Sequence, residues 1–252
     1  MVNPHDHRIL IPVDILGGQG VPATIVDAFA SVPVVVLGYH EIPDQTSPEQ
    51  AQSEFEAQAR AELEKLQDVF ETVGCAVTTR LVFTRDRYKT FERVALELDC
   101  DSILLLNPAP VLERMLVAIR GDVNVDHVAR LVATVLTDTD IDVTLLHVAS
   151  SDDERAHGEA ALEMAASILE ENGIERHRIK TTVDDGKPTD AILNAAADHD
   201  LLVVGESRPS IRKLIFRDRA DRIARRSVDP VIVVRGSYLE SNRPDTGSTD
   251  EQ

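Results

Sequence analysis

The residues most able to do chemistry lie in a basic segment, residues 206–229. Eight cations stand there against four acids, although the whole chain has a formal net charge of −18. Guanidinium groups bind phosphate oxygens through paired hydrogen bonds, so the segment predicts a phosphate site. Two other interpretations stay open: a solvated helix face whose arginines pair with acids, and a patch that docks a protein partner. The cations are Arg208, Arg212, Lys213, Arg217, Arg219, Arg222, Arg225 and Arg226.

A second candidate is the run 18–23, Gly-Gln-Gly-Val-Pro-Ala, which formally fits the dinucleotide pattern G-x-G-x-x-A. Glu41 follows it about 20 residues later, as the pattern asks. In a true fingerprint the first glycine ends the strand directly, whereas here residues 14–17 intervene. Pro22 also suits the first turn of a helix better than the inside of such a motif. We interpret the run as a flexible turn.

Metal and nucleophile patterns are absent from the sequence. The eight histidines show no H-x-x-x-H or H-E-x-x-H spacing, and we expect His147 to be a packed or capping residue. Cys75 and Cys100 have no C-x-x-C spacing, so we expect packed thiols. No G-x-S-x-G motif offers a nucleophilic serine. We therefore predict that the protein itself has no metal site and no catalytic residue, and that it is not an enzyme.

The amino-acid composition indicates which kinds of partner and which location to expect for the protein. With 44 acids against 26 cations, the chain repels nucleic acid backbones, so we predict no nucleic acid partner. The cations comprise 21 Arg and only 5 Lys, and an acidic, lysine-poor surface is typical of a salt-adapted host, which we expect to be an archaeon; an ordinary acidic mesophilic protein is the alternative. Residues 1–8 lack an apolar signal region, and no window approaches 18 apolar residues, so we predict a cytoplasmic protein without membrane insertion.

The elements that must position these residues follow an alternating pattern, in which short apolar runs alternate with stretches of helical periodicity. In the first half we predict strands over 8–14, 33–39, 75–83 and 102–107, with helices from 22 and over 48–74 and 88–98. In the second half we predict strands over 114–120, 142–149, 179–183, 201–205 and 230–235, with helices over 125–136, 153–173 and 188–199. The pattern repeats, which indicates two similar βαβ units.

Several of these strands resemble those of universal stress proteins. Ile9-Leu-Ile-Pro-Val-Asp14 is similar to their opening strand and Leu145-Leu-His-Val148 to their second strand. Residues 201–206 and 229–235 resemble their fourth and fifth strands, and the resemblance extends over residues 8–236. It implies two tandem Rossmann-like three-layer α/β/α domains with parallel sheets. We place them at 7–110, where the fifth strand is missing, and at 112–236, followed by a disordered tail over 237–252.

The resemblance also implies a nucleotide site, because many members of the family bind ATP through G-x-x-G, about nine residues, then G-S or G-T. Small residues let backbone N–H groups approach phosphates at a helix N-terminus. Here Arg208 and Arg217-Asp218 replace family glycines and serine, and Arg120 replaces an acid. The implied ligand is ATP or AMP, with no metal beyond a nucleotide-bound Mg²⁺. The implied phosphate residues are Gly205, Ser207, Arg208, Arg217 and Asp218, and the adenosine side is lined by Ile119, Arg120 and Val148.

Three functions compete at this point. The first is a regulatory stress-response protein that binds an adenine nucleotide in the second half without robust turnover. The second is a nucleotide-free module that docks on a protein such as a transporter, since some relatives are associated with transport. The third is an ATP-consuming enzyme, which would need a metal-binding acid, for which Asp218 is the nearest candidate.

Assembly follows from the last strand. Val231–Val234 would be an exposed apolar edge, and in this family fifth strands commonly pair antiparallel across a dimer. We therefore predict a homodimer through Val231–Val234. The alternative is that the two halves pack face to face as an internal pseudo-dimer.

Overall fold

The structure is a computed structural model that describes residues 7–43, 45, 47–107, 111–120, 124–205 and 230–236. The basic segment 206–229 and the tail 237–252 lie outside this range. The prediction that the tail is disordered therefore concerns residues outside the described range.

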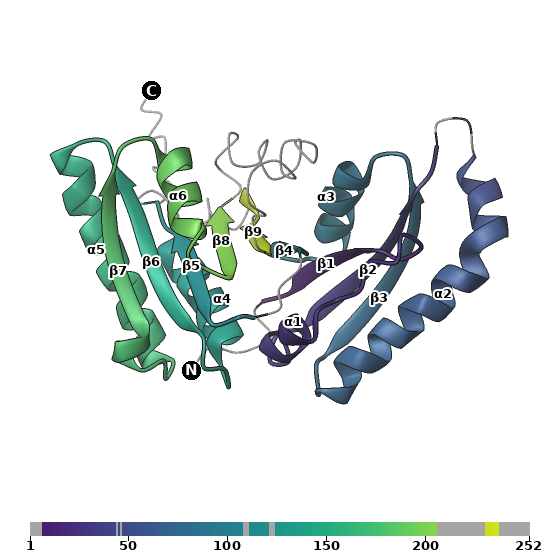
Figure 1. Cartoon of the computed structure of the whole chain (residues 1–252), viewed down its shortest axis with the longest axis horizontal. Helices are drawn as coiled ribbons and strands as arrows, with labels where there is room; N and C mark the ends of the chain where they lie inside the picture. The colour runs from purple at the N-terminus through teal and green to yellow at the C-terminus, as the bar shows by residue number, and fades with distance from the viewer. Residues whose placement is uncertain are drawn as a thin grey trace, which may run out of the picture.

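Two successive βαβ series make up the described chain (Figure 1). The first half contains β1 (Ile9–Asp14), α1 (Ala23–Ala28), β2 (Val34–Glu41), α2 (Pro48–Thr72), β3 (Val77–Thr84), α3 (Arg87–Glu97) and β4 (Ser102–Leu105). The second half contains β5 (Arg114–Ala118), α4 (Val125–Leu136), β6 (Asp142–Ala149), α5 (Asp152–Glu171), the 3-10 turn η2 (Arg176–Arg178), β7 (Ile179–Asp185), α6 (Pro188–Ala196), β8 (Leu201–Gly205) and β9 (Val231–Val234). Every predicted strand and helix is present, with small shifts at the ends.

Local signals explain where the long helix α2 begins and ends. The Ser47 side chain accepts a hydrogen bond from the Gln50 backbone N–H at 3.1 Å, which satisfies one of the free donors of the first turn. Pro48 follows at the first helical position, where its missing N–H costs nothing. Gly74 has φ +83° and takes the left-handed conformation that terminates many helices.

The nine strands among the described residues form a single sheet in the order β3-β2-β1-β4-β9-β8-β5-β6-β7. Neighbouring strands run parallel except β4 and β9, which pair antiparallel with Ile103 opposite Val233. The expected α/β fold with parallel sheets is confirmed, and the sheets of the two halves are joined by this one antiparallel pair into a single, mostly parallel sheet. In the part of the first half that the structure describes there are four strands, and β9 of the second half continues their sheet. The boundaries at 7–110 and 112–236 stay a prediction.

The pairing of β9 also corrects the predicted dimer contact. Its residues pair with β8 on one side and β4 on the other, so both of its edges are occupied within one chain. Val231–Val234 is consequently not an exposed edge, and a homodimer through this strand would have to break existing pairing. The halves do not pack face to face either; they join edge to edge.

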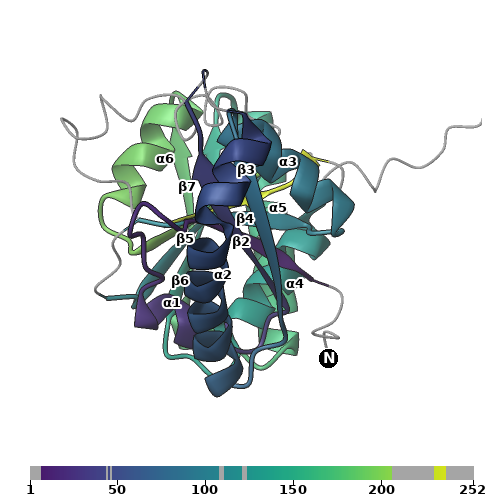
Figure 2. The ribbon, with the colours of Figure 1, turned by 90° about the vertical axis from the view of Figure 1, so that its right-hand side faces the viewer.

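Helices cover both faces of the sheet, which confirms the three-layer α/β/α class. One core cluster packs residues of α1, α2, α4 and α5 against the sheet, and it runs through both halves. On the opposite face, separate clusters lie under α3 in the first half and under α6 in the second. Figure 2 shows α2 lying along the outer strands of the first half. Alternate residues of each strand face opposite clusters, as the pleat requires. Of the described helices, none has the length and apolar character needed to cross a bilayer.

Candidate functional site

The carboxyl edge of the second half brings together half of the predicted site. In the sheet, Ala118 of β5 pairs with Leu146 of β6 and with Val204 of β8. Ile119 and Arg120 therefore follow β5 beside Val148 and Gly205, at the edge where parallel α/β sheets bind ligands. The other predicted phosphate residues, Ser207, Arg208, Arg217 and Asp218, lie outside the described residues.

The four described residues share an edge but not a face. Ile119 is 2% exposed and packs in the cluster under α4 and α5, whereas Val148 is 5% exposed and packs in the cluster under α6. The backbone N–H of Ile119 donates to Leu146 at 2.8 Å, and its carbonyl lies 3.1 Å from Nδ1 of His147. This edge therefore offers a rigid apolar base, with Arg120 and Gly205 partly exposed above it. The expectation that His147 is packed is confirmed.

An acidic side chain from α5 adds to this edge. The Ser151 side chain accepts from the Glu154 backbone N–H at 3.2 Å, and Glu154 accepts from the Ser150 N–H at 2.7 Å. These hydrogen bonds from Ser150 hold the pKa of Glu154 below its usual range, and the charges of His147 and Arg120 act in the same direction. Sequence reasoning missed Glu154, although Ser-x-x-Glu over 151–154 is the signature of a capping box. Close to Arg120, which replaces the family's acid, the chain thus supplies another carboxylate.

The corresponding edge of the first half is organised around its own turn. The Asp14 carboxylate accepts from the Gly17 backbone N–H at 3.1 Å, and a Cβ on Gly17 would stand 2.5 Å from that carboxylate. Gly18 has φ +73°, and α1 is only six residues long. The turn lies over residues 15–18, and the run 18–23 leads from it into α1, which begins at Ala23.

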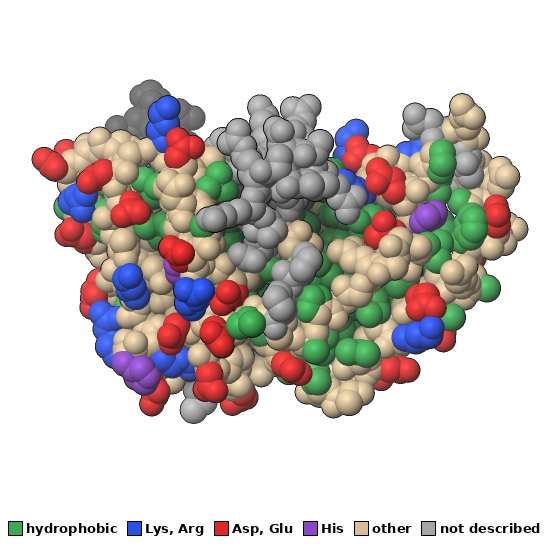
Figure 3. Space-filling model, in the orientation of Figure 1, with side chains coloured by type: hydrophobic (Ala, Val, Ile, Leu, Met, Phe, Trp, Pro, Cys, Tyr) green, Lys and Arg blue, Asp and Glu red, His purple; other side chains and the backbone are tan. Residues whose placement is uncertain are grey.

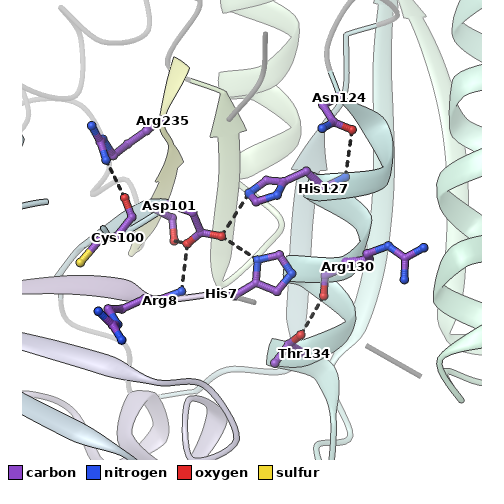
Figure 4. Close-up of polar contacts among 10 residues, drawn as sticks. His7, Arg8, Cys100, Asp101, Asn124, His127, Arg130, Thr134 and Arg235 are labelled. Carbon is purple, nitrogen blue, oxygen red and sulfur yellow. Dashed lines mark hydrogen bonds and ion pairs between the residues drawn. The ribbon is translucent and has the colours of Figure 1, made fainter. Parts of the chain in front are cut away.

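A cluster that no sequence pattern indicated lies where the halves meet (Figure 4). His7 precedes β1, Asp101 precedes β4 and His127 lies on α4 of the second half. Oδ2 of Asp101 is 2.6 Å from Nδ1 of His7 and 3.1 Å from Nε2 of His127. The two rings meet edge to face with centroids 5.0 Å apart. Their positions are 94 and 26 residues from Asp101 along the chain, so no short spacing rule could reveal them.

Both carboxylate oxygens of Asp101 have polar partners. Oδ1 accepts from the Arg8 backbone N–H at 3.3 Å and from the Ser102 hydroxyl at 3.2 Å. Burial acts to raise the pKa of Asp101, but its contacts with His127 and His7 outweigh burial and hold that pKa below its usual range. The described chain therefore contains a buried, charged carboxylate between two imidazoles.

A groove of about 940 Å³ lies at the opposite end of the strands. Residues from both halves line it, including Pro33 before β2, Gly74 after α2, Asp138 after α4 and Gly173 after α5. It opens at the amino ends of the strands, so it is separate from the carboxyl edge that holds Ile119 and Gly205.

On the face shown in Figure 3, acidic side chains are spread over both halves.

Comparison with known proteins agrees with this geometry. Residues 112–235 match the sequence model of the universal stress protein family, so the second half is similar to the domains of this family. None of the curated proteins compared by sequence matches the chain.

Solved structures extend the likeness of fold to both halves. A universal stress protein from Archaeoglobus fulgidus DSM 4304 aligns with a TM-score of 0.57 at 15% identity, covering 90% of this chain and 98% of that one. A putative universal stress protein from Pseudomonas aeruginosa UCBPP-PA14 aligns with a TM-score of 0.53 at 12% identity, covering 93% and 94%. The cytoplasmic domain of a prokaryotic cation chloride cotransporter gives 0.53 at 12% identity, covering 90% and 94%. At such identities these matches show the fold alone.

Proposed function

We propose that the protein is a cytoplasmic regulatory protein of the universal stress type that binds an adenine nucleotide, ATP or AMP, without robust turnover. The observation that carries the proposal is the convergence of Ile119, Arg120 and Gly205 on one carboxyl edge, inside the domain that matches the family. Binding would then control the protein's conformation or its contacts, and no bond in the nucleotide needs to break.

The described residues fit part of such a ligand. Gly205 ends β8 without a side chain, so its backbone can approach a phosphate closely. Ile119 gives a buried apolar base at the same edge. Arg120 and Glu154 provide one cation and one carboxylate, which can bind phosphate and ribose hydroxyl groups respectively. In this proposal Arg208 and Arg217 replace the family's glycine backbone as the phosphate ligands, with Ser207 and Asp218 beside them, and any Mg²⁺ arrives with the nucleotide.

Calorimetric titration of ATP and of AMP into the full chain at high salt tests the proposal. We expect saturable binding by the natural protein and its loss in Arg217→Ala and in Gly205→Val, whose new side chain would block backbone approach. Arg93→Ala is the matched control, because Arg93 is an exposed α3 residue paired with Glu97. Absence of heat and of thermal stabilisation at millimolar nucleotide would overturn the proposal, as would equal losses in the control.

A second candidate is a nucleotide-free docking module for a partner such as a transporter. The observation that favours it is the similar fold of a cotransporter's cytoplasmic domain. It predicts that neither the natural chain nor Gly205→Val binds an adenine nucleotide. A homodimer formed through a surface other than β9 belongs to the same candidate, and sedimentation of the purified chain over a concentration series tests it.

A further inference from the structure

We propose that His7, Asp101 and His127 form a binding site for a divalent transition metal of the zinc class at the junction of the two halves. Each of the three residues offers one donor atom, and these three atoms all lie within 4.8 Å of one another. Two imidazole nitrogens and one carboxylate oxygen are a donor set that zinc and its neighbours in the first transition row accept.

The spacing of the donors suits such an ion. Bonds of about 2.0–2.2 Å in tetrahedral geometry place ligand atoms about 3.3 Å apart. The distances from Oδ2 of Asp101 are 2.6 Å to His7 and 3.1 Å to His127, so side-chain shifts of less than about 1 Å would admit a metal. A water molecule would complete the fourth position.

Outer contacts orient the ligands as they do in known metal sites. The Arg8 backbone N–H and the Ser102 hydroxyl donate hydrogen bonds to Oδ1 of Asp101. These bonds orient the carboxylate so that Oδ2 faces the two imidazoles. The Asn124 side chain accepts from the backbone N–H of His127 at 3.2 Å and fixes the start of α4. Such partners hold ligands in place before the metal arrives.

Burial and charge give the site a reason to take a cation. The side chains of Asp101 and His7 are each only 2% exposed, and a buried carboxylate is costly unless a positive charge compensates it. A divalent ion would provide that charge. The His127 side chain is 16% exposed. The competing state is the metal-free cluster, in which the carboxylate contacts both histidines directly, and the experiment below separates the two.

Metal bound here would connect the halves. His7 and Asp101 precede the central strands β1 and β4 of the first half, whereas His127 belongs to the second. A ligand that binds only the folded state stabilises it by mass action. Metal should therefore strengthen the contact between the halves independently of any nucleotide.

Titration of ZnCl₂ into the chelator-treated full chain, by calorimetry and by thermal unfolding, tests this site. We expect uptake of one equivalent and a rise in Tm, both lost in His7→Gln/His127→Gln. The control His157→Gln/His177→Gln changes two exposed histidines and should behave like the natural protein. Unsaturable uptake, or uptake unchanged in the His7/His127 variant, would overturn the proposal.

A measurement on the natural sequence covers the case in which that variant does not fold. X-ray absorption of the zinc-loaded protein should show scattering from two imidazoles at the metal. A spectrum without two imidazoles would overturn the site. Because this readout uses no nucleotide, its failure is distinguishable from failure of the proposed function.

Discussion

At the scale of residues, the ring of His147 packs directly against Gly158 in the second half. The His147 ring is 6% exposed and bonds to the carbonyl of Ile119, at the edge that holds the candidate nucleotide site. Gly158 lies inside α5, where a Cβ would run into the ring atoms Cδ2, Cγ and Nε2 of His147. The glycine is therefore required by the ring, despite its cost within a helix.

Gly158→Ala should destabilise the protein by about 1–3 kcal/mol, the usual cost of overpacking. The direction of this change in the free energy of unfolding is informative, because alanine inside a helix otherwise stabilises by about 1 kcal/mol relative to glycine. Urea unfolding of Gly158→Ala, His147→Ala and the double variant measures the effect. We expect the alanine to be tolerated once the ring is removed. A stabilising Gly158→Ala in the natural background would contradict this packing.

The two cysteines should be inert in the folded state. Burial raises the pKa of Cys75 to about 11 and that of Cys100 to about 12, and both thiols are free. Because the thiolate is the reactive form, iodoacetamide at pH 8 should label neither residue in the native chain. Both should react after unfolding in urea. Rapid labelling of the folded protein at either position would contradict the structure.

At the scale of elements, the start of α3 should give the fold a defined pH dependence. The Asp86 side chain accepts from the Lys89 backbone N–H at 3.1 Å, and this hydrogen bond holds the pKa of Asp86 below its usual range. A carboxylate with a depressed folded-state pKa stabilises above its unfolded pKa and loses that contribution as pH falls through the folded value.

Asp86→Asn keeps a capping side chain but removes the titration. We expect the natural protein to be the more stable at pH 7, with the difference shrinking toward zero as acid protonates Asp86. Urea unfolding of both proteins between pH 7 and pH 3 measures this, and the effect should be small because Asp86 is exposed. A difference that stays constant over this range would contradict the assignment.

Local patterns were sufficient to predict the elements. The limits of α4, β6 and β8 agree with the expected 125–136, 142–149 and 201–205, because apolar periodicity and the capping Asn124 are encoded within a few residues. The antiparallel pairing of β4 with β9 was not predictable in the same way. It joins residues about 130 positions apart, and an apolar strand looks the same whether its partner belongs to the same chain or to another.

The site was predictable only in part for the same reason. Family-like strand ends located Ile119, Arg120 and Gly205 correctly at one edge, since parallel topology follows from the order of elements. The face of the sheet on which a side chain such as Ile119 or Val148 lies is set by the alternation of residues along its strand at that edge. His7 and His127 meet Asp101 only because the halves join, which no local spacing records.

At the scale of the whole molecule, β9 should join the halves within one chain. Ile103→Cys with Val233→Cys places two thiols directly opposite across β4 and β9. Oxidation should give an intrachain disulfide that leaves the 27.7 kDa chain monomeric on a non-reducing gel. Ile103→Cys with Ile232→Cys is the control, because these side chains pack in clusters on opposite faces of the sheet and should not link. Disulfide-linked dimers as the main product of the first pair would show that β9 pairs between chains.

The most direct test of the proposed function is hydrogen exchange of the full chain with and without ATP at high salt. We predict protection at the carboxyl ends of β5 and β8, around Ile119 and Gly205, with no change at the corresponding edge of the first half near Asp14. Absence of protection at saturating ATP, or protection confined to the first half or to the groove at the amino ends of the strands, would contradict a nucleotide site in the second half.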